Sequence, residues 1–305
     1  QYKKQHLHAN ITPMPLWTDL SQAISDATGK PFQARRHHTV GGGCINNAYV
    51  LEDGKQRYFV KTNTPDKVGM FVAEAAGLQA ILATRTLCAP KPICHGVADG
   101  IAYLVLECIE IVNGSGRSAA LLGKQLAAMH RVTVSRYGWD IDNTIGATPQ
   151  INTWRDDWIQ FYGEHRLRFQ LDLAERNGHP MQAKGEKLIG HLPDFFISYH
   201  PQPALLHGDL WGGNWGEDPQ DNPVVFDPAL YYGDRETDIA MTELFGGFPA
   251  SFYAAYADAY PLDAGYATRK DLYNLYHMLN HFNLFGGGYG GQAARLIEKL
   301  LAELG

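Results

Sequence analysis

The 305-residue sequence contains few cysteines, and they are not spaced for a metal site or a disulfide framework. None of the four, Cys44, Cys88, Cys94 and Cys108, is part of the Cys-x2-Cys pair that zinc sites favour. Disulfide-stapled secreted domains are much richer in cysteine. The composition therefore indicates reduced thiols in an intracellular protein, and we expect a cytoplasmic location.

Positive charge and long apolar runs are also scarce. The chain has 26 Lys and Arg against 32 Asp and Glu, a net charge of −6. Without a basic surface it is not expected to bind nucleic acid or an anionic membrane. No uninterrupted apolar run approaches the roughly 18 residues that cross a bilayer, and Gln1–Pro15 lacks the apolar stretch of a signal peptide. The length suits one large domain or two lobes.

What the sequence does contain is a concentration of Gly, Asp and Asn between two apolar segments. The segments Ala204–Leu206 and Val224–Phe226 predict strands, and His207-Gly-Asp-Leu-Trp-Gly-Gly-Asn214 predicts a tight loop between them. Asp227 follows the second strand and closes the predicted hairpin. A purely structural hairpin turn would use the same residue types.

Phosphoryl transfer would give these residues a different role. It needs a carboxylate that accepts the proton of the attacking hydroxyl, and a second carboxylate and an amide that hold magnesium against the phosphates. Asp209 and Asn214 have the Asp-x4-Asn spacing of a kinase catalytic loop, and Asp227 takes the place of the Asp in Asp-Phe-Gly. The pattern predicts Asp209 as the catalytic residue and Asn214 and Asp227 as ligands of Mg²⁺.

A glycine-rich segment near the N-terminus predicts a loop that could approach a phosphate. It lies between two predicted strands, which end at Val40 and at Leu51, and consists of Gly41, Gly42, Gly43 and Cys44. Glycine leaves room for a ligand because it has no side chain. The segment is not a P-loop, since no Gly-Lys-Ser/Thr follows. A plain hairpin turn is the alternative.

Lys61 and Glu74 are spaced like the ion pair that positions ATP phosphates in protein kinases. Lys61 lies near the end of a predicted strand, 56–62, and Glu74 lies thirteen residues later in a predicted helix, 69–84. Solvated surface charges would look the same. A further predicted strand, 102–107, leaves the sheet at Glu107, Cys108 and Ile109, where a kinase hinge would offer its backbone to adenine.

The rest of the chain is predicted to be mainly helical. The stripe Trp154, Trp158, Phe161 and His165 predicts a helix over 154–176, and further helices are expected at 252–260, 270–284 and 292–304. We expect an ATP-binding domain over residues 1–108 and a domain over 109–305 that carries the catalytic loop.

Taken together, these motifs resemble the protein-kinase-like superfamily and, within it, the fructosamine kinase (ketosamine 3-kinase) family. The His-Gly-Asp loop alone is shared with aminoglycoside and choline kinases. Trp211, Thr148-Pro-Gln150 and Tyr231-Tyr-Gly233 narrow the resemblance, which extends over roughly residues 17–300.

The resemblance implies an α+β, bilobal protein-kinase-like fold, with a small antiparallel-sheet N-lobe with one helix and a larger, mostly helical C-lobe. It implies ATP-dependent phosphorylation of the 3-hydroxyl of ketosamines, which are ribulosamine, erythrulosamine or fructosamine adducts of amines. The phosphorylated adduct breaks down and frees the amine, so the activity repairs glycation. The cofactors would be ATP and Mg²⁺, and the substrate a small-molecule or protein-bound ketosamine.

In this interpretation the glycine loop covers the phosphates, Glu74 fixes Lys61 on them, and Asp238 anchors the catalytic loop. Candidate substrate contacts are Trp211, Tyr231, Asp234 and His281. Cys44 is a candidate redox-sensitive thiol, so the chain would be a monomer or a redox-dependent homodimer. An aminoglycoside or choline-type kinase and a nucleotide-binding pseudokinase scaffold are the alternatives.

Overall fold

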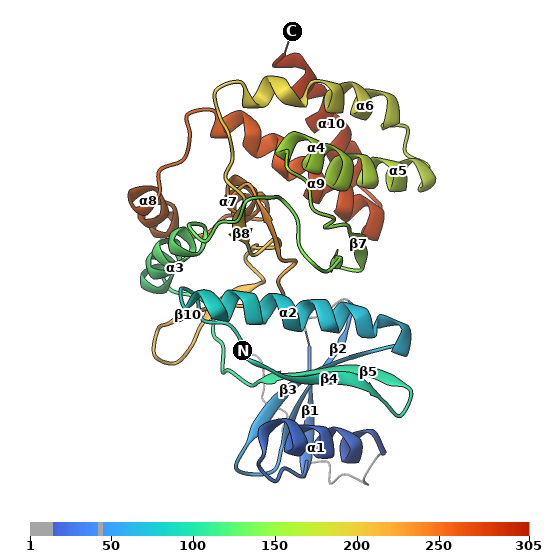
Figure 1. The fold of residues 1–305 in the computed structure, drawn as a ribbon, viewed down its shortest axis with the longest axis vertical. Helices are drawn as coiled ribbons and strands as arrows, with labels where there is room; N and C mark the ends of the chain where they lie inside the picture. Colours follow the sequence, from blue (N-terminus) through green and yellow to red (C-terminus); the bar gives the residue numbers. More distant parts are fainter. Residues whose placement is uncertain (1–14, 42–44, 305) are drawn as a thin grey trace. The chain divides into compact units, whose positions relative to one another are not determined.

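The computed structural model describes residues 15–41 and 45–304, and the chain divides into two compact units (Figure 1). The N-terminal unit includes the chain up to Gln79 together with Pro90–Ile109. The C-terminal unit comprises Ala80–Ala89 and Glu110–Gly305. The sequence predicted a boundary after residue 108, and the structure additionally groups residues 80–89 with the later part of the chain.

The N-terminal unit is built on a five-stranded antiparallel sheet with the strand order β1-β2-β3-β5-β4. Its strands are β1 (Arg36–Val40), β2 (Asn47–Glu52), β3 (Arg57–Asn63), β4 (Pro92–Ala98) and β5 (Ile101–Glu107). Helices α1 (Pro15–Thr28) and α2 (Val68–Thr84) lie on opposite faces of this sheet (Figure 1). Leu20 and Ile24 of α1 pack in one core with Leu51, Val60 and Val105 of the strands. Burial of this apolar face holds the helix on the sheet.

Helix α2 is unusually apolar. By length and composition alone, the segment Pro65–Thr84 could cross a membrane, although no single uninterrupted apolar run in it is that long. Its Phe71 and Leu78 are fully buried, and its Glu74 forms an ion pair with Lys61 of β3. Part of the helix therefore packs inside the folded unit, where 33% of its most apolar stretch is buried.

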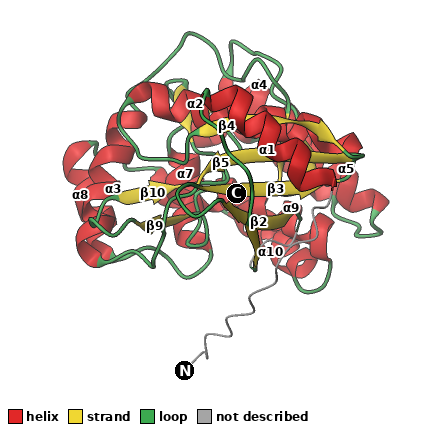
Figure 2. Cartoon of the chain, turned by 90° about the horizontal axis from the view of Figure 1, so that it is seen from below, coloured by secondary structure: helices red, strands yellow, loops and turns green. Residues whose placement is uncertain are grey.

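The C-terminal unit is mainly helical, as the colours of Figure 2 show. Its helices are α3 (Gly116–Met129), α4 (Trp158–Tyr162), the π-helical turn η2 (Gly163–Arg168), α5 (Phe169–Arg176), α6 (Gln182–Gly190), α7 (Glu236–Leu244), α8 (Ala250–Ala259), α9 (Tyr266–Phe285) and α10 (Tyr289–Ala302). The 3-10 turns η1 (Pro65–Lys67, before α2) and η3 (Leu192–Phe196) complete the helical elements. Helix α3 packs closely on α8, because Gly123 lies against the carbonyl of Phe252 and leaves no space for a side chain there.

The C-terminal unit also contains three two-stranded sheets. They pair β6 (Asn143–Ile145) with β7 (Thr148–Gln150), β8 (Ala204–Leu206) with β11 (Tyr231–Gly233), and β9 (Trp215–Glu217) with β10 (Pro223–Val225). The prediction of one hairpin between 204–206 and 224–226 is therefore wrong. The first of these segments pairs with β11, and the second pairs with β9 in a hairpin that follows the catalytic loop.

The predicted helix over 154–176 begins later than expected. Its first regular turn is α4, and the Asp157 side chain caps it by accepting a hydrogen bond of 2.7 Å from the amide of Gln160. Trp154 precedes this cap, so it does not belong to the helical stripe. Its indole Nε1 instead donates to Asp140, at 2.9 Å. Trp158 and Phe161 are core residues, as expected.

Candidate active site

The loop that follows β8 is fixed by one buried carboxylate. Asp238 of α7 accepts hydrogen bonds from the backbone amides of His207 (2.7 Å) and Gly208 (2.8 Å), and its Oδ2 lies 3.1 Å from His130 Nε2. Burial opposes the charge on Asp238, but the bond with His130 and the neighbouring histidines outweigh it and hold its pKa below the ordinary value. His207 Nε2 contacts the carbonyl oxygen of Phe226 at 3.0 Å. This anchoring geometry agrees with the role expected of Asp238.

Gly208 brings the loop against the segment that follows Asp227. Its φ is +84°, and a Cβ atom at this position would lie 2.0 Å from the carbonyl oxygen of Ala229. The amide of Ala229 donates to the carbonyl of His207 at 2.9 Å. Because backbone occupies the space, no side chain fits at Gly208.

Asp209 and Asn214 lie together in the loop. Asn214 Nδ2 donates to the backbone oxygen of Asp209 at 2.8 Å and to its carboxylate Oδ2 at 3.1 Å. Burial and the negative charge of Asp227 raise the pKa of Asp209 to about 7, although the bond from Asn214 opposes the shift. A carboxyl group with this pKa can accept a proton near neutral pH.

Asp227 follows β10 and has a φ of +57°, which is unusual for a residue with a side chain. The residue before Asp227 is bonded directly to the catalytic loop, because the amide of Phe226 donates to the carbonyl of Asn214 at 3.0 Å. Within residues 15–41 and 45–304, no group of three or more His, Cys, Asp or Glu side chains could hold a metal. Magnesium in nucleotide sites takes one or two protein ligands and completes its shell with phosphate oxygens and water. Asp227 and Asn214 fit such a shared site.

Side-chain amides support the segment immediately after Asp227. Gln150 Nε2 donates to the carbonyl of Ala229 at 3.1 Å, and Asn143 Nδ2 donates to that of Leu230 at 2.8 Å. Gln150 is held in turn by Tyr276, whose hydroxyl donates to its Oε1 at 2.7 Å. In the sequence, Gln150 stands out only as part of the Thr-Pro-Gln motif of the resemblance. Its position in a loop with other amide residues was the only signal of this structural role.

The N-terminal unit contains the predicted ion pair. Lys61 Nζ lies 2.6 Å from Glu74 Oε1, and both side chains are largely buried. A carboxylate at this distance fixes the position of the lysine ammonium group. The glycine loop can be followed only at Gly41, since Gly42, Gly43 and Cys44 lie outside the described residues.

Glu107, the first residue of the predicted hinge, is hydrogen-bonded to Lys91. The backbone amide of Glu107 donates to the carbonyl of Lys91 at 2.8 Å, and its carboxylate accepts from the amide of Lys91 at 3.2 Å. Its N–H is therefore unavailable to a nucleotide. Any contact with adenine in this segment would use the carbonyl of Glu107 or the backbone of Cys108 and Ile109.

Two of the four candidate substrate residues belong to one row of aromatic rings. The ring of Trp211, which is 39% exposed, lies 6.4 Å from that of Phe245. The ring of Phe245 lies 4.6 Å from that of His281. Because Trp211 is two residues from Asp209, this row extends from the catalytic loop to helix α9.

The other two candidates, Tyr231 and Asp234, are buried and held by neighbouring side chains, so this structure gives no support for a contact with substrate, which stays a prediction. Tyr231 is 3% exposed, and the guanidinium of Arg166 lies 4.1 Å from its ring centre. Asp234 is fully buried, and its carboxylate accepts hydrogen bonds from the hydroxyls of Tyr199 and Tyr273.

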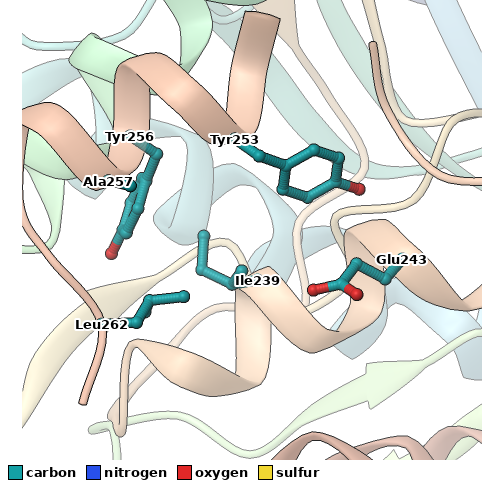
Figure 3. A pocket seen from close by; sticks show the side chains of 6 residues that line it. All are labelled: Ile239, Glu243, Tyr253, Tyr256, Ala257 and Leu262. Carbon is teal, nitrogen blue, oxygen red and sulfur yellow. The ribbon is translucent and has the colours of Figure 1, made fainter. Parts of the chain in front are cut away.

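Hydrogen bonds connect Asp238, the anchor of the catalytic loop, through His130 to Tyr256, which lines a small apolar cavity. The hydroxyl of Tyr256 lies 2.7 Å from His130 Nδ1, and the Tyr256 ring forms part of a cavity of about 260 Å³ (Figure 3). The cavity is lined by Ile239, Glu243, Tyr253, Tyr256, Ala257 and Leu262. It lies behind the support of the loop, so the reacting groups do not line it.

Solved structures of other proteins share the fold of this chain. A solved structure of a putative fructosamine-3-kinase from Haemophilus somnus superposes with a TM-score of 0.87 at 30% identity, over 92% of this chain and 96% of that one. An aminoglycoside phosphotransferase at 14% identity, with a TM-score of 0.56, shares the fold. The expected α+β, protein-kinase-like fold is therefore confirmed.

Relatives found by sequence share a higher identity with this chain than the solved structures do. The chain is 50% identical to a probable ketoamine kinase of Synechocystis, over 95% of this chain and 98% of the relative. It is 43% identical to a chloroplastic protein-ribulosamine 3-kinase of Arabidopsis thaliana, over 97% and 94%. The family model described as fructosamine kinase matches residues 16–303. On these matches, the chain belongs to the fructosamine kinase family.

Proposed function

We propose that this protein is a ketosamine 3-kinase, which transfers the γ-phosphoryl group of ATP to the 3-hydroxyl of a ketosamine. The observation that carries the proposal is the contact of Asp209 with Asn214 in a loop linked to Asp227. The names of the relatives, ketoamine kinase and protein-ribulosamine 3-kinase, supply the substrate class. The phosphorylated adduct would break down and release the amine.

Asp209 would orient the sugar 3-hydroxyl and accept its proton. Burial raises the pKa of this carboxyl, which favours its acceptance of a proton. General-base assistance contributes on the order of 10²–10⁴ in rate, and correct alignment of the reactants contributes more. The bond from Asn214 would hold the carboxylate in one orientation.

Asp227 and Asn214 would hold magnesium, which neutralises charge on the phosphates when bound. A cation there would also relieve the repulsion between Asp227 and Asp209. Lys61, fixed by Glu74, would bind phosphate oxygens, and Gly41–Cys44 would cover them. The backbone of residues 107–109 would bind adenine, apart from the engaged amide of Glu107.

Trp211 and His281 would contact the ketosamine. Both lie in the row of rings that begins at Trp211, two residues after Asp209. Aromatic faces suit the apolar face of a sugar and the carbon chain of the modified amine.

The test is ATP consumption with ribulose-lysine, erythrulose-lysine and fructose-lysine side by side, with choline and an aminoglycoside as controls. Mass spectrometry of the products should find one added phosphate on a ketosamine and none on the controls. Phosphorylation of choline or the aminoglycoside alone would favour the alternative kinase classes. Nucleotide binding without turnover of any acceptor would favour the scaffold.

A further inference from the structure

A second hollow on the C-terminal unit is lined by two tryptophans and two acids. It has a volume of about 490 Å³ and is lined by Arg136, Trp139, Asp140, Asp142, Thr153 and Trp154. We call it the two-tryptophan hollow. Neither the catalytic loop nor Asp227 lines it.

The backbone holds the walls of this hollow in place. The amide of Trp139 donates to the carbonyl of Asn152, and Tyr137 and Arg155 exchange two backbone hydrogen bonds, all at 2.9 Å. Gly138 exchanges two more with Tyr232 of β11. The hollow is therefore built on paired backbone, which positions its side chains before any ligand arrives.

Three aromatic rings pack together beside the hollow. The ring of Tyr232 lies 5.8 Å from that of Trp139 and 6.1 Å from that of Trp154, with which it is stacked. Alternate side chains of a strand point to opposite faces. Tyr232 therefore points away from Tyr231, which packs in the core.

The acids give the hollow a negative charge. Asp140 Oδ1 accepts from the indole of Trp154, and Asp142 Oδ1 accepts from the amide of Asn152 at 2.7 Å. In the part of the chain that the structure describes, Oδ2 of either acid accepts no hydrogen bond and neither acid has an ion-pair partner. Arg136 also lines the hollow, and its guanidinium forms an exposed ion pair with Asp156 at 2.7 Å.

We propose that the two-tryptophan hollow binds a cationic side chain, lysine or arginine, of the polypeptide that carries the ketosamine. The proposal rests on the proposed function for the identity of this polypeptide. Aromatic faces attract alkylammonium and guanidinium groups. The nearby carboxylates attract the same cations, because their charge is opposite. A neutral sugar would gain the stacking but would leave the charge of both acids uncompensated.

One arm of the test measures binding without catalysis. An unmodified lysine-containing peptide is titrated into ¹⁵N-labelled protein, and the indole N–H resonances are followed. The signal of Trp154 should move with the lysine peptide and much less with the peptide acetylated on lysine. The shift should weaken as salt is raised, because exposed charges are screened. This arm gives its answer even if the chain phosphorylates no ketosamine.

The second arm measures the kinase. A peptide with one ribulosyl-lysine and one nearby lysine is compared with the same peptide acetylated on the second lysine, over a series of spacings. At the best spacing we expect the free lysine to lower KM by roughly fivefold, the size of an exposed cation–π contact assisted by charge. The double variant Asp140→Asn, Asp142→Asn should lose this preference while keeping wild-type turnover of free ribulose-lysine.

The matched control is Asp194→Asn, which removes an exposed acid paired with His191 elsewhere on the same unit. It should keep both the preference and the indole shift. A preference that survives in the double variant would overturn the proposal. So would a Trp154 resonance that responds to free ribose and ignores the lysine peptide, since the hollow would then be a carbohydrate site.

Discussion

Replacement of Asp238 by Asn tests whether one carboxylate holds the catalytic loop. Asp238 Oδ1 accepts from Gly208, while Oδ2 accepts from His207 and contacts His130. Asparagine keeps only one acceptor oxygen. Its amide nitrogen must therefore face at least one backbone N–H, and the least damaging orientation places it opposite Gly208.

The expected cost follows from those contacts. A hydrogen bond to a charged acceptor contributes about 1.5–3 kcal/mol, and a buried donor left without a partner costs about 1–3 kcal/mol. We expect a loss of about 2–4 kcal/mol in the free energy of unfolding, which lowers Tm by on the order of 5 °C. The looser loop should also misplace Asp209 and reduce kcat by roughly 10- to 100-fold.

Differential scanning fluorimetry and steady-state kinetics measure both effects, and circular dichroism verifies that the variant is folded. Asp194→Asn serves as the control for removal of a charge. If Asp238→Asn retains Tm within about 1 °C and turns over at the wild-type rate, the reasoning about the anchor is refuted.

Three further predictions concern the reacting groups and pH. Asp209→Asn should lower kcat by on the order of 10² while KM for ATP changes only a few-fold; steady-state kinetics that retain wild-type kcat would remove Asp209 from the mechanism. Asp227→Ala should raise the magnesium concentration needed for half-maximal activity more than Asn214→Ala does, because Asp227 carries charge; an unchanged titration would leave it only a turn residue. Burial, aided by the charge of His281, lowers the pKa of His277 to about 3. The contribution of neutral His277 to stability is therefore complete above about pH 6.5 and is lost as pH falls, by up to about 1.4 kcal/mol per pH unit. The free energy of unfolding, measured with urea at several pH values, should fall less steeply between pH 6 and pH 4 in His277→Gln than in the wild type. An equal dependence on pH in the two proteins would contradict the assignment.

The sequence predicted those features whose signal is local. The loop His207–Asn214 contains a carboxylate and an amide residue with kinase spacing within eight positions, so this spacing indicated phosphoryl transfer. Strand and helix patterns predicted the elements that carry Lys61 and Glu74, and the ion pair is present at 2.6 Å. That these residues act on ATP stays a prediction.

Features that depend on distant contacts could not be predicted in this way. Nothing near β8 indicates that its partner is β11 rather than the segment before Asp227, because pairing is decided by packing across the unit. Tyr231 and Asp234 have residue types common in binding sites. Only the folded chain places Arg166 over Tyr231 and buries Asp234 beneath tyrosine hydroxyls.

Gly208 has a consequence for the gene as well as for the enzyme. Every amino-acid replacement there adds a Cβ atom at 2.0 Å from the oxygen of Ala229, so alanine is excluded as firmly as tryptophan. A codon library at this position, selected for activity, should return only synonymous glycine codons. Directed evolution of this kinase toward new sugars must therefore vary the residues around the loop while this codon keeps its amino acid.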